Sequence, residues 1–419
     1  MSFGSKTPRA DTAASAASSP VKGAGHLIEL DPLDCCAPIS PERADEAARR
    51  YLTLVTASKD STRRGGTGCI TKVFNSYGEV FCLKSLLGVD DRAIGRKRAA
   101  AIFRGRAKAF HEEYIVQRAV SGIDGWPATY GFGFYAGGPV ILMDWLEGRT
   151  LRSMVPYLPR ASKNSYGMAP EWIASIGIRV LQFLLAAESR DPGFVHRDIS
   201  PRNIMVRLDR VPLRNQLAQG MLDLVLIDLG SATSVDAEQI AAAAALGFTQ
   251  QTDIWRNGTI EYAAPEMLTH DAPGIEALRH SPKLDVYALC SVLYELYCGH
   301  TPYQLEERPG LSPYRVKLDY APVGIAPRER GDEELLHCII LGLSAAQEAR
   351  PGTYELCSML MNWLGLRAPA MAQMLAANPP LIRYETPLRD LQLVPLSYQA
   401  GGLRGADSRL PEVLERRMK

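Results

Sequence analysis

The chain has 419 residues, 46% of them hydrophobic, and a formal net charge of +1 at pH 7. Such a chain can bury a sizeable core, and its balanced charge gives no electrostatic reason to expect a nucleic-acid partner. The eight cysteines form no CxxC pair, which favours reduced thiols over a disulfide framework or a zinc site. No apolar run reaches the ~18 residues of a membrane span, and the N-terminus lacks the apolar core of a signal peptide. We therefore expect a cytoplasmic protein with no membrane span.

The first third of the chain is predicted to be mainly strands after a flexible start. Residues 1 to about 45 are rich in Ala, Ser and Thr and are expected to be a mostly disordered tail. Residues 66–86 predict a β-hairpin, with strands "CITKVF" and "EVFCLKSL" around the turn "NSYG". Residues 92–120 are basic and then helical. The segment "PVILMDWLEG", residues 139–148, predicts a buried strand that runs into a polar turn.

Helical patterns dominate the rest of the chain. An apolar periodic helix is predicted over 170–188, and the strands "NIMVRL" and "LDLVLIDLG" flank a loop at 208–220. Three further helices are predicted over 285–298, 333–344 and 353–364. Strands early and helices late predict an α+β protein with a small β-rich lobe and a larger helical lobe.

The β-hairpin carries residues that suit a nucleotide phosphate. Phosphoryl transfer needs backbone amides, a lysine, metal ligands and a base around the phosphates. Gly66 and Gly68 open a tight turn before a strand, although glycines alone indicate only a turn. Lys84 lies near the centre of an apolar strand, which is costly unless a carboxylate meets it. Glu113, or its neighbour Glu112, lies on the next helix and could be that partner.

The segment "FVHRDISPRNIMV", residues 194–206, places polar side chains within an apolar surrounding. Asp198 could accept the proton of an acceptor hydroxyl, and Asn203 could bind a metal. Asp228 follows the apolar run "LVLI", which should deliver it to a strand end beside Asp198. Two acids and an amide in this arrangement predict a magnesium site.

These segments, in this order, resemble the signature set of eukaryotic-type (Hanks-type) serine/threonine protein kinases. "VHRDISPRN" resembles the catalytic loop, "IDLG" resembles the DFG motif, and "GTIEYAAPE" at 258–266 resembles the end of an activation segment. "LDVYALCSVLYELYCGHTPY" and "EARPGTYEL" resemble helical segments of the large lobe. The resemblance covers about residues 60 to 366 and implies a bilobal protein-kinase-like fold. The loose motifs favour a bacterial member of the family.

The resemblance implies a small lobe over 46–145, a large lobe over 146–366 and a C-terminal tail over 367–419 of open role. It implies an enzyme that transfers the γ-phosphoryl group of ATP, with Mg²⁺, to serine or threonine hydroxyls of protein substrates. Two alternatives are a pseudokinase scaffold and a small-molecule kinase of the aminoglycoside or choline type. The presence of Lys84 and Asp198 disfavours the first, and the APE-like segment disfavours the second.

The resemblance also assigns roles to individual residues. Asp198 is implied to be the base, while Asn203 and Asp228 hold magnesium. Lys84 is implied to bind the α- and β-phosphates and to pair with Glu113. The other implied ATP-binding residues belong to the phosphate-covering loop, the hinge and the two adenine faces: Gly66, Gly68, Val73, Cys82, Met143, Asp144, Leu146 and Met205.

Four more residues are implied to be structural. Glu266 would form a buried pair with Arg350, and Asp285 would anchor the catalytic loop. Leu229 stands in place of the phenylalanine of DFG, a size-conserving apolar change that should still pack.

Ser200 departs from the family pattern, which has a lysine there to meet the γ-phosphate. Arg202 is predicted to supply the missing cation, and the alternative is a solvated surface arginine. Thr259 in "GTIEYAAPE" favours a serine or threonine acceptor over tyrosine. Arg197, taken as an unpaired arginine beside a mobile segment, is a suitable partner for a phosphate. We therefore expect autophosphorylation within 228–266, with Thr249 or Thr252 as the favoured site.

Overall fold

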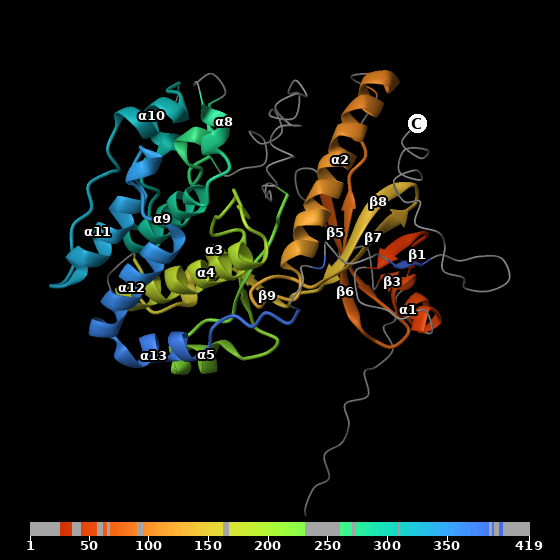
Figure 1. Ribbon diagram of the computed structural model, residues 1–419, viewed down its shortest axis with the longest axis horizontal. Helices are drawn as coiled ribbons and strands as arrows, with labels where there is room; N and C mark the ends of the chain where they lie inside the picture. Colours follow the sequence, from red (N-terminus) through yellow and green to blue (C-terminus); the bar gives the residue numbers. More distant parts are fainter. Residues whose placement is uncertain are drawn as a thin grey trace, which may run out of the picture.

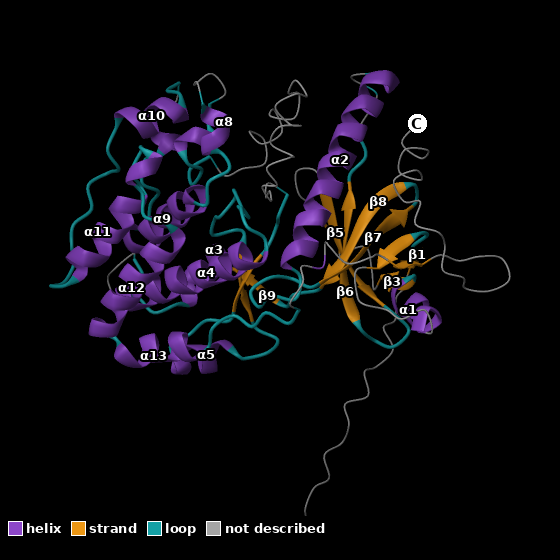
Figure 2. Cartoon of the chain, in the orientation of Figure 1, coloured by secondary structure: helices purple, strands orange, loops and turns teal. Residues whose placement is uncertain are grey.

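The computed structural model describes residues 26–35, 43–56, 62–64, 68–89, 92, 95–161, 167–230, 260–269, 274–308, 310–384, 388 and 394–396. Within these residues the chain forms two lobes, one built on a large antiparallel sheet and one built mainly of helices (Figure 1). Figure 2 shows that most strands lie in one lobe and most helices in the other, with α1 and α2 beside the large sheet. The predicted α+β, bilobal architecture is confirmed.

Among the described residues, the small lobe contains a nine-stranded sheet. Its strands follow the order β1-β3-β5-β6-β8-β7-β2-β12, and β4 pairs with β5. Its strands are β1 (His26–Glu29), β2 (Leu33–Cys35), β3 (Thr53–Thr56), β4 (Thr62–Arg64), β5 (Gly68–Phe74), β6 (Val80–Leu86), β7 (Thr129–Tyr135), β8 (Gly138–Asp144) and β12 (Val394–Leu396). Its helices are α1 (Ala44–Tyr51) and α2 (Arg96–Val120). The predicted hairpin is β5–β6, and its turn is closed by Asn75, whose Oδ1 accepts hydrogen bonds from the N–H groups of Tyr77 and Glu79.

Alternation along β6 sorts its side chains between the two faces of this sheet. Phe81 and Leu83 pack in a core that includes α1 residues on one face. Lys84 and Leu86 point to the other face, where Leu86 packs with Phe110 of α2 and its neighbours. The central strand β6 therefore presents Lys84 to the face that α2 covers.

The large lobe is helical, with a small sheet of order β11-β10-β9. Its helices are α3 (Leu151–Met154), α4 (Pro170–Arg190), α5 (Leu213–Gln219), α8 (Ile275–Leu278), α9 (Lys283–Cys298), α10 (Pro313–Asp319), α11 (Asp332–Gly342), α12 (Thr353–Arg367) and α13 (Pro369–Ala377). Among the residues that the structure describes, the lobe also has four short 3-10 helices: η3 (Val155–Tyr157), η4 (Pro265–Met267), η5 (Leu305–Glu307) and η6 (Gln347–Ala349). The strands are β9 (Gly148–Thr150), β10 (Ile204–Arg207) and β11 (Leu224–Leu226).

The predicted helices of this lobe are confirmed, and the shorter helices α3, α5, α8, α10 and α13 were not predicted. Residues 208–220 are not only a loop, because α5 lies within them and ends at Gly220 with φ +73°. In the described part of the chain, α4 is the one helix long and apolar enough to cross a membrane, and 67% of that window is buried inside the protein. Its apolar side chains, including Ile173 and Leu181, build the core of the large lobe.

The prediction of a mostly disordered tail over residues 1 to about 45 is wrong for residues 26–35. These residues form β1 and β2, and Ile28, Leu30 and Leu33 are buried. The two strands are short, and each extends the sheet beside a strand much later in the chain, β3 for β1 and β7 for β2. Residues 1–25 and 36–42 lie outside the described residues.

The C-terminal tail contacts both lobes. Helix α13 packs on the large lobe through Ala372 and Leu375. Beyond it, the N–H of Arg383 donates to the carbonyl of Gly122, and β12 pairs with β2 of the small lobe. Between them, Nη2 of the buried Arg118 on α2 donates to the carbonyl of Leu388 at 2.6 Å. The described parts of the tail therefore contact the large lobe, α2 and strand β2 of the small lobe.

Candidate active site

Lys84 is held by two carboxylates, one from each lobe. Its Nζ lies 2.5 Å from Oε1 of Glu113 on α2 and 3.1 Å from Oδ1 of Asp228, which follows β11. Glu113 is buried, whereas Glu112 is exposed and lies 3.8 Å from Lys108 on the solvent side of α2. The choice that the sequence left open is therefore settled in favour of Glu113.

The charges of this cluster support one another. Burial alone would lower the pKa of Lys84, but the charges of Asp228 and Glu113 outweigh burial and raise it. The ammonium in turn lowers the pKa of Asp228, while burial raises the pKa of Glu113. A lysine that stays charged beside Asp228 suits the binding of phosphate oxygens.

The backbone around Asp228 is tightly constrained. Asp228 has φ +67°, a conformation that a non-glycine residue adopts only with support from its surroundings. A Cβ atom at Gly230 would lie 3.3 Å from Oδ1 of Asp228 and 3.6 Å from Oε2 of Glu113. Glycine at 230 therefore leaves room for both carboxylates to approach Lys84.

Asn203 connects Asp198 to the Asp228 segment. Its Nδ2 donates to Oδ2 of Asp198 at 2.8 Å and to the backbone carbonyl of Asp198 at 2.9 Å. Its own carbonyl accepts the N–H of Ile227 at 2.9 Å, next to Asp228. The predicted grouping of Asp198, Asn203 and Asp228 is thus present.

The donor set fits a magnesium ion. Because Nδ2 of Asn203 is used on Asp198, its amide oxygen is left for a cation, and the side chain of Asp228 is half-exposed. Among the described residues, no group of three or more His, Cys, Asp or Glu side chains is placed to hold a metal. Magnesium commonly takes only one or two protein oxygens and completes its shell with substrate phosphate and water.

Asp285 of α9 anchors the backbone of the predicted catalytic loop, as expected from the sequence. The carboxylate of Asp285 accepts the N–H of His196 at 2.7 Å and the N–H of Arg197 at 2.8 Å. Burial raises the pKa of Asp285 to about 7, and these two hydrogen bonds oppose that rise. The two hydrogen bonds also stabilise the left-handed backbone conformation of Arg197, whose φ is +66°. This conformation sets the direction of the chain as it enters Asp198.

Two more predicted structural features are confirmed. Arg350 donates to both oxygens of Glu266, at 2.6 and 2.9 Å, in a buried ion pair. Leu229 is 2% exposed and packs in the large-lobe core. Both features hold the ends of the segment 228–266, of which residues 231–259 lie outside the described residues, as do the predicted phosphorylation sites Thr249 and Thr252.

The premise that Arg197 is unpaired is wrong. Its Nη2 lies 2.9 Å from Nδ1 of His280, in the segment that leads to α9. A phosphate that binds Arg197 would therefore have to share this side chain with His280.

Ser200 and Arg202 differ sharply in burial. Ser200 is fully buried, and its hydroxyl has no hydrogen-bond partner among the described residues. Arg202 is exposed. The role predicted for Arg202 at the γ-phosphate stays a prediction.

One residue assigned to the ATP site faces the wrong way. Val73 pairs with Phe81 across β5 and β6 and is buried in the core on the α1 side of the sheet. The opposite face carries Cys82 and Lys84, whose partners on β5 are Lys72 and Ile70. Since side chains alternate along a strand, Val73 cannot share a face with Cys82.

Lys72 lies on this opposite face of the sheet and was not predicted from the sequence. Its ammonium pairs with Glu147 and lies 5.0 Å from the ring centroid of Trp145, so β5 contacts the segment after β8. Side chains two residues apart on a strand share a face, so counting from Lys84 across the hairpin would have placed Lys72 on the same face of the sheet. Gly68 lies on the same face, with Cε of Lys84 3.7 Å from the site of a Cβ atom, while Gly66 lies outside the described residues.

The predicted hinge follows β8. Met143 pairs with Cys82 and therefore shares its face of the sheet, and Leu146 is partly buried beyond it.

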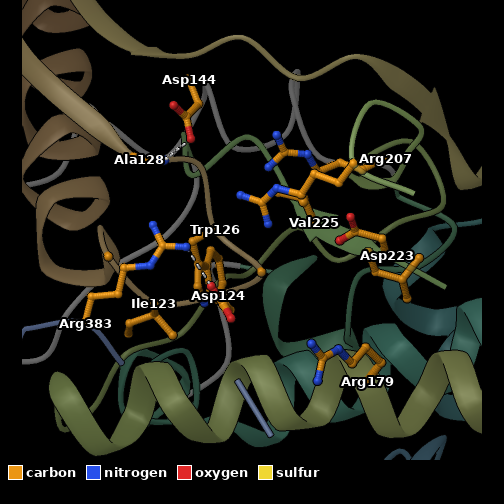
Figure 3. Close-up of a pocket in the computed structure, with 14 residues that line it drawn as sticks. Ile123, Asp124, Trp126, Ala128, Asp144, Arg179, Arg207, Asp223, Val225 and Arg383 are labelled. Carbon is orange, nitrogen blue, oxygen red and sulfur yellow. Dashed lines mark hydrogen bonds and ion pairs between the residues drawn. The ribbon is translucent and has the colours of Figure 1, made fainter. Parts of the chain in front are cut away.

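The carboxylate of Asp144 accepts hydrogen bonds from Oη of Tyr130 at 2.6 Å and from the N–H of Ala128 at 3.2 Å (Figure 3). The side chain of Asp144 is thus engaged within the small lobe, and its N–H donates to the carbonyl of Ala128 at 2.8 Å. Met205, on β10 of the large lobe, is partly buried.

Figure 3 shows a separate polar cavity that Asp144 also lines. Its charged lining consists of four arginines and three aspartates: Arg179, Arg207, Arg210, Arg383, Asp124, Asp144 and Asp223. Arg383 of the tail lies 3.1 Å from Asp124, and Arg207 is paired with Asp209. The ion pair between Arg383 and Asp124 joins the tail to the turn after α2 at this cavity.

Part of the chain is similar to known proteins. Residues 140–326 match the family model described as "Protein kinase domain". The chain is 28% identical over 228 residues to serine/threonine-protein kinase PkaB of Streptomyces coelicolor, covering 54% of this chain and 46% of that protein. It is 26% identical over 231 residues to serine/threonine-protein kinase PknL of Mycobacterium tuberculosis, covering 55% and 46%. A putative mitogen-activated protein kinase kinase kinase 7-like protein of Drosophila melanogaster is 28% identical over 225 residues, covering 52% and 46%.

These matches have a defined extent. The chain spans about half the length of the curated relatives named above. The family match begins within β8, so Lys84 and Glu113 lie outside it. Their place in the site comes from the distances measured in the structure.

Proposed function

We propose that this chain is an ATP-dependent serine/threonine protein kinase of the Hanks type, because residues 140–326 match the protein kinase domain model and the relatives PkaB and PknL named above are serine/threonine-protein kinases. The observation that carries the proposal is the pairing of Lys84 with Glu113 and Asp228, next to Asp198 and Asn203. A lysine, three carboxylates and an amide of the kinds that phosphoryl transfer uses therefore lie close together, while the catalytic-loop cation is left to Arg202 as a prediction.

Lys84 would bind the α- and β-phosphates of ATP. Its ammonium has three N–H donors, and the carboxylates of Glu113 and Asp228 fix its direction. Positioning of this kind removes the entropic cost of aligning the nucleotide at the moment of reaction. The adenine ring would lie on the face of β6 and β8 that Cys82 and Met143 share, against the backbone that follows Met143.

Asp198 would act as the base. The oxygen of a serine or threonine hydroxyl attacks the γ-phosphorus, its proton passes to the carboxylate of Asp198, and ADP leaves. The hydrogen bond from Asn203 fixes the direction of the Asp198 carboxylate. Asp228 and the amide oxygen of Asn203 would hold Mg²⁺, which supplies charge neutralisation at the phosphates when bound.

An assay with γ-labelled ATP tests the proposal. The purified chain is incubated with labelled ATP and Mg²⁺ alone, with a generic protein acceptor, and with small alcohols such as choline. We expect label on serine and threonine of protein, in the acceptor or in the chain itself. Label on the small alcohol only would indicate a small-molecule kinase, and ATP binding without any transfer would indicate a scaffold.

A further inference from the structure

Lys317 of α10 is a buried lysine that the site described above does not use. It is 1% exposed, and in the described residues its ammonium donates only to backbone carbonyl oxygens. The acceptors belong to Ile260 at 2.7 Å, Glu261 at 2.9 Å and Ala263 at 2.6 Å. An ammonium has three N–H donors, so all three are used on one short stretch of chain.

Residues 260–264 have little regular structure of their own. They lead into η4, against which α10 packs, and their carbonyl groups need partners from elsewhere in the fold. A second contact holds the same stretch from another side, since Oη of Tyr262 donates to Oε2 of Glu295 on α9 at 2.5 Å. The backbone of the stretch is therefore fixed by Lys317, and its buried side chain by α9.

A lysine is an expensive means of filling this position. Removing its charge from water costs free energy, and an apolar side chain would pack in the same space without that cost. The rings of Tyr287 and Tyr303, with centroids 5.5 and 5.8 Å from Nζ, offset only part of it. What the lysine adds is directional control of three carbonyl groups.

We propose that Lys317 is a positioning residue for the protein acceptor: it holds the backbone of residues 260–263 in the shape that binds the acceptor polypeptide. This inference rests on the proposed function, because it assigns the stretch before η4 to acceptor binding. Lys317 touches neither nucleotide nor hydroxyl, and it acts through the stretch that it holds.

A pH dependence accompanies this geometry. Burial lowers the pKa of Lys317 to about 7. The charged and titratable groups that face it are Glu261 and Glu266, which oppose the lowering, Arg350, which adds to it, and the rings of Tyr287 and Tyr303. Above this pKa the amine keeps two N–H donors for three carbonyl groups, so the hold on the stretch weakens as pH rises.

The first test compares Lys317→Met with Arg315→Met, a matched control that removes an exposed cation from the same helix. We expect Lys317→Met to raise the KM for a peptide acceptor about tenfold or more, because binding must then pay for ordering the stretch. The KM for ATP and the slow hydrolysis of ATP without acceptor should stay within about twofold of the parent. Arg315→Met should behave like the parent in every assay.

Two results would overturn the inference while leaving the proposed function intact. One is an unchanged acceptor KM in folded Lys317→Met. The other is a parallel loss of ATP affinity, acceptor affinity and thermal stability, which indicates a lysine that merely supports the fold. A parent enzyme that hydrolyses ATP but phosphorylates no protein would overturn both.

The second test needs no variant that could fail to fold. The acceptor KM of the parent is measured between about pH 6 and about pH 8.5 with a peptide that lacks histidine, so that the acceptor does not titrate. We expect this KM to rise through pH 7 while the KM for ATP stays flat. Lys317→Arg, whose guanidinium stays charged, should flatten the rise. A flat acceptor KM in the parent overturns the inference.

Discussion

Lys84 and Glu113 lie 29 residues apart in the chain, and their side chains meet at 2.5 Å. The contact joins the central strand of the small lobe to α2, and Asp228 of the large lobe contacts the same ammonium. The position of this pair therefore shows whether α2, the sheet and the Asp228 segment are assembled around Lys84.

Substitution of Glu113 should be far more damaging than substitution of Glu112. Glu113→Ala leaves the Lys84 ammonium without its closest partner, and we expect kcat/KM to fall at least about tenfold, or ~1.4 kcal/mol. Glu112→Ala removes only an exposed carboxylate 3.8 Å from Lys108 and should remain within about twofold of the parent. Steady-state kinetics of the two variants decide, and a reversed order would contradict the geometry.

Asp198→Asn should abolish phosphoryl transfer while ATP still binds. The amide is the same size as the carboxylate, but it cannot accept the proton of the acceptor hydroxyl. Turnover in the labelled-ATP assay is compared with nucleotide affinity from equilibrium titration. Turnover within about tenfold of the parent would rule out Asp198 as the base.

Arg202→Ala tests whether a cation has moved within the catalytic loop. If Arg202 donates to the transferring phosphate, its removal should lower kcat by roughly two to three powers of ten and leave ATP affinity nearly unchanged. Because Ser200 is fully buried, Ser200→Lys is a poor rescue at its own position, and Arg202→Lys is the better control. Parent-like turnover of Arg202→Ala would leave the γ-phosphate without a catalytic-loop cation.

Asp34 should make the stability of the small lobe depend on pH. Burial raises its pKa from 3.8 to about 6, against the opposing charge of Arg118. The folded state therefore holds this proton more tightly than the unfolded state, so stability falls as pH rises from about 4 to about 6 and stays level above. Asp34→Asn should remove this loss and gain up to about 3 kcal/mol at pH 7 but nothing at pH 4. Thermal unfolding of both proteins across this range provides the measurement, and equal differences at pH 4 and pH 7 would contradict it.

Deletion of residues 381–419 should loosen α2. It removes the Leu388 carbonyl that receives Arg118, together with β12 and its buried Leu396. We expect the Tm to fall by about 5 °C or more, with a matching loss of turnover. Deletion of 397–419 alone keeps these contacts and serves as the control. Equal behaviour of the two deletions would show that the tail does not support α2.

The sequence by itself determined the parts of this protein whose residues are close together in the chain. The spacing of Asp198 and Asn203 sets one loop, and a side-chain hydrogen bond of 2.8 Å within that loop holds it. Apolar periodicity placed α4 and α9, because a helix shows its buried face within a few turns. The order of the motifs also predicted the two lobes correctly.

Only the tertiary structure decided which distant residues meet and which way they face. It selected Glu113 over Glu112, brought β1, β2 and β12 into one sheet, and directed Lys317 at the stretch before η4. It also placed Val73 on the core face of the sheet and Lys72 on the other. The physical reason is that strand alternation has a period of two residues, so a register shift of one residue reverses every side chain, and register is set by pairing with strands elsewhere in the chain.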